Sequence, residues 1–279
     1  MEQSWNGFIR KAVGVLGKYF EISKIYMKTQ LAWRGDVLFN MFFTIARIIF
    51  AYLLWGIVFQ NHEMVGQFTF HGMLSYYIIH SFLSQLEMSD GISAEIHDRI
   101  RNGTFSKYMV IPVGIERYFM AMELGVVVFY MAFDFIAAVV WIFVFRIHFV
   151  FAENVASIFC AVLMALLGMV FMVQFNYFLG LLTLKYQGIG TFLMIKNNLM
   201  MLVSGGIVPL ALFPETAVRV MQVLPFYYVG YLPSMILTGQ CREMAVSGVI
   251  AIMCWCLLMQ IVIQVVSKKY LRKYDGVGI

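Results

Sequence analysis

Charged side chains that could do chemistry are concentrated in residues 91–113, GISAEIHDRIRNGTFSKYMVIPV. This segment is the longest strongly charged break between the apolar runs of the chain. It combines arginines with acids and a histidine, and the last two residue types are used in proton transfer and metal binding. The five histidines are scattered along the chain, however, and none shares a metal-ligand spacing with a carboxylate. We therefore predict neither a catalytic residue nor a metal site.

The register of the charged segment is that of a short amphipathic helix. Asp90 can cap its start, and Asn102-Gly103 can end it. Its apolar residues recur at i, i+4 and i+8 and are Ile92, Ile96 and Ile100. A helix of about ten residues cannot span a bilayer. Residues 89–113 therefore form either a solvated loop helix between two membrane spans or a docking site for a soluble partner.

The composition predicts an all-α integral membrane protein. The chain is 62% apolar and only 13% charged, where a soluble domain would have about 25% charged residues. We expect a single transmembrane domain over residues 1–279, with no separate soluble domain. The net charge of +5 comes from Lys and Arg that flank apolar runs, which favours membrane orientation over nucleic-acid binding. The four cysteines form no disulfide framework or zinc motif.

Six apolar runs are predicted to cross the membrane as helices. They cover residues 36–59, 66–88, 118–145, 150–182, 191–205 and 244–266. The third and fourth exceed the roughly 20 residues that a bilayer requires, which implies tilt or protruding ends. Residues 1–35 interleave basic and apolar side chains and are too polar for a secretory signal. They predict an amphipathic helix along the inner membrane face, the alternative being a partly ordered basic tail.

The distribution of Lys and Arg predicts the orientation of these spans. With both termini inside, sixteen of the 20 basic residues lie on the inner side. Only Arg146, Arg219 and Arg242 lie outside, and Arg47 lies within a span. By the positive-inside rule, both termini and residues 89–113 are cytoplasmic.

Residues 205–240, between the fifth and sixth spans, contain four of the five prolines. The glycines that end the fifth span and the prolines of this segment are Gly205, Gly206, Pro209, Pro214, Pro225 and Pro233. Proline at this density forbids one continuous helix, yet the segment is too apolar for an ordinary exposed loop. It predicts short helical pieces that re-enter the outer half of the membrane, covered by protein. A kinked long helix is the alternative.

Two of these patterns resemble the membrane (permease) subunit of a type-two ATP-binding-cassette exporter. EIHDRIRNGTFSKYMVIPV is similar to that family's polar helix, which is followed by Arg-x-Gly-Thr, an aromatic residue or leucine, and a terminal Pro. SGGIVPLALFPETAVRVMQVLPFYYVGYLPSMILTG resembles the family's outer re-entrant segment. The likeness extends from the amphipathic N-terminal helix to the last span.

The resemblance implies a partner for the charged helix. In that family two permease subunits of six spans form the pathway, and each docks on a cytoplasmic ATPase through the helix between its second and third spans. The residues implied at this coupling interface are Ile92, Glu95, Ile96, His97, Asp98, Arg99, Arg101, Gly103 and Phe105. The charges would set the register, the apolar stripe would transmit force, and the N-terminal helix would lie beside them.

The resemblance also implies where the energy for transport comes from. The chain has no G-x-x-x-x-G-K-[ST] loop, so we expect no cofactor on it, with ATP and Mg bound by a partner ATPase. The second permease would be identical or related, and the location a bacterial inner membrane. The few fixed charges along the pathway indicate an amphipathic, lipid-like or drug-like cargo. An ion-coupled secondary transporter or a polytopic membrane enzyme is the alternative, but it would need clustered reactive groups at bilayer depth.

Arg47 is the one cation predicted in the middle of a span, where a charge costs about 2.5 to 3.5 kcal/mol on insertion scales. We expect it either to pair with Asp134 or Glu123, or to face the pathway.

Lys196 lies close enough to the end of its span to reach water, so we interpret it as a boundary residue. Asn176 and its polar neighbours in the spans are predicted to form hydrogen bonds between helices.

Overall fold

The computed structural model describes residues 2–32, 34–86, 89–186 and 188–271, with side chains from Leu16 onward except at a few positions near the start of the second helix. In this part of the chain the protein is helical, apart from an isolated bridge between Val65 and Phe68. The longer helices are α1 (Glu2–Ala32), α2 (Arg34–Val58), α3 (Phe70–Gln85), α4 (Asp90–Arg101), α6 (Ile115–Val144), α7 (Val155–Leu181), α8 (Gly190–Val203) and α11 (Ala245–Tyr270). The predicted helical segments therefore all form helices.

Shorter helical elements connect the long ones. They are α5 (Ser106–Met109), η1 (Leu182–Leu184), η2 (Leu210–Leu212), α9 (Glu215–Met221), η3 (Tyr227–Tyr231), α10 (Leu232–Leu237) and η4 (Arg242–Met244). Pro209 and Pro214 directly precede η2 and α9, Pro225 precedes η3 by two residues, and Pro233 lies in the first turn of α10. Because proline lacks an N–H and fixes φ, it is tolerated at a helix start and ends the helix before it. Residues 205–240 are accordingly a series of short helices and not one kinked helix.

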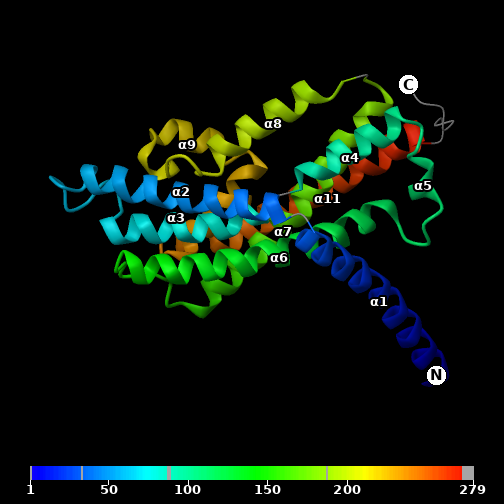
Figure 1. The fold of residues 1–279 in the computed structure, drawn as a ribbon, viewed down its shortest axis with the longest axis horizontal. Helices are drawn as coiled ribbons and strands as arrows, with labels where there is room; N and C mark the ends of the chain where they lie inside the picture. Colours follow the sequence, from blue (N-terminus) through cyan, green and yellow to red (C-terminus); the bar gives the residue numbers. More distant parts are fainter. Residues whose placement is uncertain (1, 33, 87–88, 187, 272–279) are drawn as a thin grey trace.

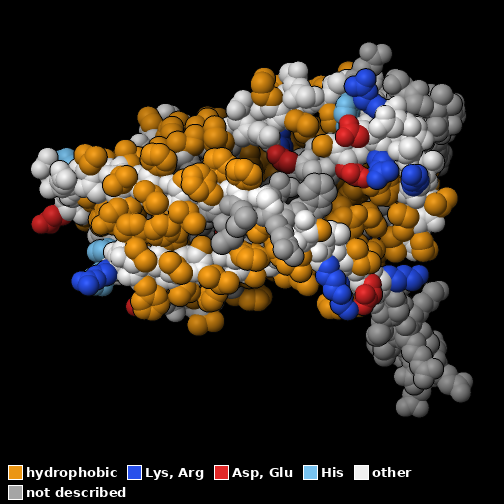
Figure 2. Space-filling model, viewed as in Figure 1, with side chains coloured by type: hydrophobic (Ala, Val, Ile, Leu, Met, Phe, Trp, Pro, Cys, Tyr) orange, Lys and Arg blue, Asp and Glu red, His pale blue; other side chains and the backbone are white. Residues whose placement is uncertain are grey.

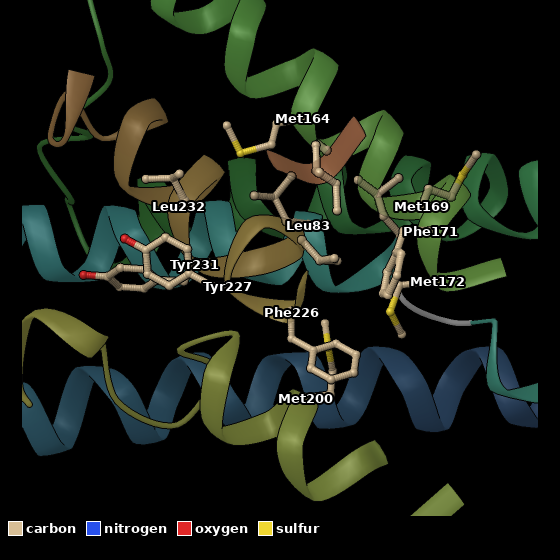
Figure 3. Packing of buried hydrophobic residues seen from close by; sticks show 14 of the residues in the cluster. Leu83, Met164, Met169, Phe171, Met172, Met200, Phe226, Tyr227, Tyr231 and Leu232 are labelled. Carbon is tan, nitrogen blue, oxygen red and sulfur yellow. The ribbon is translucent and has the colours of Figure 1, made fainter. Parts of the chain in front are cut away.

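Helix α7 lies at the centre of the molecule, where α4, α6, α10 and α11 pack against it. The start of α1, the end of α11, α4 and α5 lie at one end of the long axis, and α9 lies at the opposite end (Figure 1). Part of the central core is formed by methionine and aromatic side chains of α7 and of η3 with its neighbours (Figure 3). Met200 of α8 meets this core beside Phe226. The outer segment is therefore part of the core and not an appended loop.

The surface of the molecule is apolar around its middle. Figure 2 shows that charged side chains gather mostly toward the two ends, with hydrophobic side chains between them. Three helices of the described chain are long and apolar enough to cross a membrane, and these comprise residues 115–144, 155–184 and 242–270. A fourth, shorter apolar helix covers Phe42–Val58. The protein is thus a multi-pass helical membrane protein.

The three other predicted spans coincide with α2, α3 and α8, which have 25, 16 and 14 residues. Helix α3 is the most enclosed of them, with 12 of its residues buried. The first predicted segment is a continuous helix, α1, rather than a partly ordered tail. Several basic side chains that entered the orientation prediction lie outside the described side chains; they are Arg10, Lys11, Arg34, Arg272 and Lys273.

Candidate functional site

Helix α4 packs on α7 through its apolar stripe. Ile92, Ile96 and Ile100 are all fully buried. The two helices approach closely at Gly180 of α7, where a Cβ would lie 2.7 Å from Ile96 Cβ. Burial of three isoleucines is worth roughly 1.5–3 kcal/mol each before the entropy of ordering is subtracted. The predicted stripe therefore fixes α4 to its own chain, and its polar face is left for other contacts.

The polar face of α4 is held by a short network around Glu95. Its Oε1 accepts hydrogen bonds from Arg99 Nε at 2.8 Å and from the Tyr108 hydroxyl at 2.9 Å. Both charged side chains remain about two-fifths exposed. Burial and the hydrogen bond to Glu95 raise the pKa of the Tyr108 hydroxyl, so it stays a hydrogen-bond donor at neutral pH. Asp98 and Arg101 are exposed beside this network.

The other predicted coupling residues also help to hold α4 in place. His97 Nδ1 lies 2.9 Å from Thr183 Oγ1 of η1, which follows α7. Asn102 is the C-cap and Gly103 has a φ of +68°, which is the left-handed conformation that ends many helices. Phe105 is fully buried. Ile92, Ile96 and Phe105 thus support the helix from within, while the charged residues form its outer face.

Helix α1 lies against α6 next to this end of the molecule. Ser23 Oγ donates to the Ala121 carbonyl oxygen at 2.6 Å, and the hydroxyls of Tyr26 and Tyr118 are 2.6 Å apart. The Tyr118 ring in turn contacts Tyr108, with ring centroids 5.6 Å apart. Side-chain contacts therefore run continuously from α1 through α6 to the segment that follows α4.

The start of α4 is tied to α7 and α8 by a buried polar cluster. Lys196 Nζ of α8 pairs with the Asp90 carboxylate and lies 3.5 Å from Asn176 Oδ1. Asn176 Nδ2 donates to Ser89 Oγ at 2.7 Å. Only 3% of the Lys196 side chain is exposed. An ammonium group at this depth requires such partners, because an unpaired buried charge is strongly destabilising.

This cluster corrects two expectations from the sequence. Asp90 does not cap α4: it is the first helical residue, and the N-cap is Ser89, which makes no side-chain capping bond. Lys196 is not a boundary residue that reaches water but a buried partner of Asp90. The signal that could have found it is a lysine inside an apolar run, which needs an acid within reach. The predicted helix–helix role of Asn176 is confirmed.

Arg47 does not form the ion pair expected with Asp134 or Glu123. Asp134 instead accepts a hydrogen bond from Gln85 Nε2 of α3 at 2.6 Å, and Glu123 is buried with its Oε1 unpartnered. The ion pairs within the described residues do not include Arg47. Its side chain is exposed and lines a cavity between α2, α3, α7 and α8. Of the two expected arrangements, Arg47 therefore adopts the one that faces open space.

The loop that follows α8 is held by three side chains of α3. The Tyr76 hydroxyl donates to the Gly205 carbonyl oxygen at 3.1 Å, the Tyr77 hydroxyl donates to that of Ile207 at 2.7 Å, and His80 Nε2 lies 2.8 Å from that of Ser204. Because a carbonyl oxygen only accepts, His80 Nε2 carries a proton. These bonds satisfy carbonyls at and just beyond the end of α8. Sequence reasoning did not single out His80, which is buried.

Gly205 and the neighbouring prolines fit this loop for steric reasons. Gly205 has a φ of +75°, and a Cβ there would lie 2.4 Å from Tyr76 Oη, so a side chain would clash. Gly206 packs against the His80 ring. Pro209, Pro225 and Pro233 are buried and Pro214 is exposed.

Among the described residues, no group of three or more His, Cys, Asp or Glu side chains is placed to hold a metal ion.

A comparison with protein families identifies the chain. Residues 45–278 match the family model of the ABC-2 family transporter protein. The match covers most of the chain and includes α4, the buried cluster and the whole proline-rich segment. The protein belongs to the ABC-2 transporter family. No curated protein sequence and no solved structure gave a significant match.

Membership of the ABC-2 family gives the site a general role. Chains of this family are the membrane permease subunits of ABC transporters, so this protein is a transport subunit. The resemblance drawn from the two sequence motifs is therefore confirmed. Helix α1 lies outside the matched residues, and its contact with Tyr118 of α6 connects it to Tyr108 of α5.

Proposed function

We propose that this ABC-2 permease is the membrane subunit of an ATP-driven exporter in a bacterial inner membrane. It works with a second permease, identical or related, and with cytoplasmic ATPase subunits that bind ATP and Mg. The cargo is amphipathic, lipid-like or drug-like. ATP-driven closure of the ATPases pushes on α4, and the two permease bundles rock to open the route outward.

The observation that supports this proposal most directly is the construction of α4. An amphipathic helix that lies at the end of the molecule is fixed to the central helix by a buried stripe, and its outer face is charged. A force applied to that face is transmitted to α7 because α4 cannot move without disturbing packed side chains. Its first residue is also paired with α8. The helix is thus built to pass motion to two membrane helices.

Six membrane crossings are part of the proposal. At about 1.5 Å per residue, α3 and α8 measure about 24 Å and 21 Å from their 16 and 14 residues, less than the roughly 30 Å of a hydrocarbon core. The short helices of residues 205–240 complete the outer part of the α8 crossing as a re-entrant segment. In support, η3 and α10 are almost entirely buried by protein, as re-entrant backbone requires. Both termini and α4 then lie on the cytoplasmic side.

The test is affinity purification of the tagged protein from its own host, with mass identification of what comes with it and an assay of vanadate-sensitive ATP hydrolysis. We expect an ATPase subunit to co-purify. Replacing Glu95, Arg99 and Arg101 with alanine should release the ATPase or uncouple hydrolysis from export, because it removes the charges that set the register of the contact.

A matched control comes from α9 at the other end of the molecule. Glu215 and Arg219 form an exposed i,i+4 ion pair like that of Glu95 and Arg99. Their double alanine variant should retain the ATPase and its activity. Recovery of the permease alone, without ATP hydrolysis, from membranes in which other complexes stay intact would overturn the proposal and leave ion-coupled transport as the explanation.

A further inference from the structure

The cavity beside Arg47 has the size and position of a binding site. Its volume is about 550 Å³, and residues of α2, α3, α7, α8, the start of α4 and the loop after α8 line it. This volume is in the range of sites that bind small organic molecules. The walls combine apolar side chains with a few polar ones, so the cavity has two distinct parts. Asp90 at the start of α4 and Gly206 of the outer segment also line it.

The polar part of the cavity has an excess of positive charge. Arg47 and Lys196 line it together with a single described acid, Asp90. Lys196 is paired with Asp90, whereas the described ion pairs do not include Arg47. A guanidinium within a membrane span is costly unless an anion or water compensates it. Asp134 interacts electrostatically with Arg47, but it forms no ion pair with Arg47 and does not line the cavity. The Arg47 guanidinium is therefore open to an anion on the cavity side.

The apolar part is formed by flexible and aromatic side chains. Phe43 lies on the α2 wall, and Met172, Met200 and Met201 come from α7 and α8. Methionine adapts to apolar groups of different shape because it is unbranched and polarizable. We propose that this cavity binds the cargo, and that the cargo is an amphiphile with one anionic head, such as a carboxylate or phosphate monoester. Arg47 holds the head through its planar fork of N–H donors, and the methionines and Phe43 hold the apolar body.

Lys196 gives this site a connection to α4. Its ammonium group lines the cavity and also binds Asp90, the first residue of α4. An anionic head that approaches Lys196 competes with Asp90 for the same ammonium. Cargo binding thus weakens the ion pair that ties α4 to α8. The effect of cargo on ATP hydrolysis rests on the proposed role of α4 in docking an ATPase. Anionic amphiphiles should therefore stimulate ATP hydrolysis, and uncharged analogues should not.

The test uses the purified permease in a neutral detergent and a fluorescent fatty acid, dansylaminoundecanoate. We expect the carboxylate to bind roughly tenfold or more tightly than its methyl ester, because only the carboxylate pairs with Arg47. Arg47→Met should reduce carboxylate affinity to that of the ester, whereas Arg47→Lys should keep part of the difference. Arg219→Met, an exposed cation on α9, should leave binding unchanged.

Further arms separate the possible outcomes. Inorganic phosphate at millimolar concentration should not displace the probe. Displacement would show that the site binds free anions, and it would overturn the proposal that the ligand is an amphiphile. Equal binding of carboxylate and ester, or carboxylate preference that survives in folded Arg47→Met protein, would also overturn the site. If an ATPase co-purifies but the carboxylate is not preferred, the cavity proposal fails and the exporter stands. If the preference is found without any ATPase, the exporter fails and the anionic site stands.

Discussion

At the scale of single residues, the close packing of α4 on α7 depends on Gly180 of α7. A Cβ there would lie 2.7 Å and 2.9 Å from Ile96 Cβ and Cγ2, which are branched and cannot move without the helix. We predict that Gly180→Ala is destabilising, because overpacking costs about 1–3 kcal/mol and exceeds the gain of about 1 kcal/mol in helix propensity. Thermal unfolding in detergent should show a lower Tm.

The matched control is Gly56 in α2, where a Cβ would meet nothing within 4 Å. Gly56→Ala should keep or raise the Tm, because it gains helix propensity without a clash. If the two variants gave the same Tm, the close approach of α4 and α7 would not be a determinant of stability.

The ion pair of Asp90 and Lys196 is a second residue-scale determinant. Asp90→Asn leaves the buried Lys196 ammonium without its counter-charge. Breaking a buried pair costs about 3–5 kcal/mol, and we expect about 2 kcal/mol here because Asp90 is half exposed. The double variant Asp90→Asn with Lys196→Met should be more stable than Asp90→Asn alone. A double-mutant cycle on unfolding free energies measures this coupling.

The exposed pair Glu215 and Arg219 is the comparison for that cycle. Both side chains are more than 70% exposed, and exposed pairs contribute little. Its coupling free energy should be close to zero. Additive effects of the two changes at Asp90 and Lys196 would contradict a role for this pair in tying α4 to α8.

At the scale of elements, the position of α1 depends on a glycine in its partner helix. A Cβ at Gly125 of α6 would lie 2.1 Å from the Ser23 carbonyl oxygen and 2.8 Å from its carbonyl carbon. These are backbone atoms, so α1 must move as a whole. We predict that Gly125→Ala displaces α1 from α6 and speeds trypsin cleavage at Lys24 and Lys28 several-fold, since docked helices resist local unfolding.

Gly17, in α1 itself, is the control for this prediction, because a Cβ there meets nothing within 4 Å. Gly17→Ala should leave cleavage at the same lysines unchanged or slow it. Equal cleavage of the Gly125→Ala and wild-type proteins would mean that α1 does not depend on its contact with α6.

At the scale of the whole molecule, the arrangement of helices predicts which loops face which side of the membrane. Ser106 in α5 and Glu153 in the loop before α7 are both exposed and lie at opposite ends of α6. In a variant without the native cysteines, we expect an impermeant maleimide to label Glu153→Cys on intact spheroplasts. Ser106→Cys should react only after the membrane is permeabilised. The reverse pattern would contradict cytoplasmic termini.

The sequence by itself determined which segments form helices and where several of them end. The isoleucine stripe of α4, the stop at Asn102-Gly103 and the breaks at the four prolines are local features, and each follows from the conformations that nearby residues permit. The same holds for the long apolar helices. Local patterns were also sufficient to indicate the family, because its two motifs are short continuous stretches.

Only the tertiary structure decided which side chains meet across helices. Lys196 and Asp90 are 106 positions apart, His80 and Ser204 are 124 apart, and Gln85 and Asp134 are 49 apart. Such pairs depend on the rotation and relative depth of packed helices, which neither periodicity nor composition specifies. For this reason the sequence left open whether Arg47 pairs with an acid or faces the pathway, whereas in the packed helices Asp134 binds Gln85 and Arg47 faces a cavity.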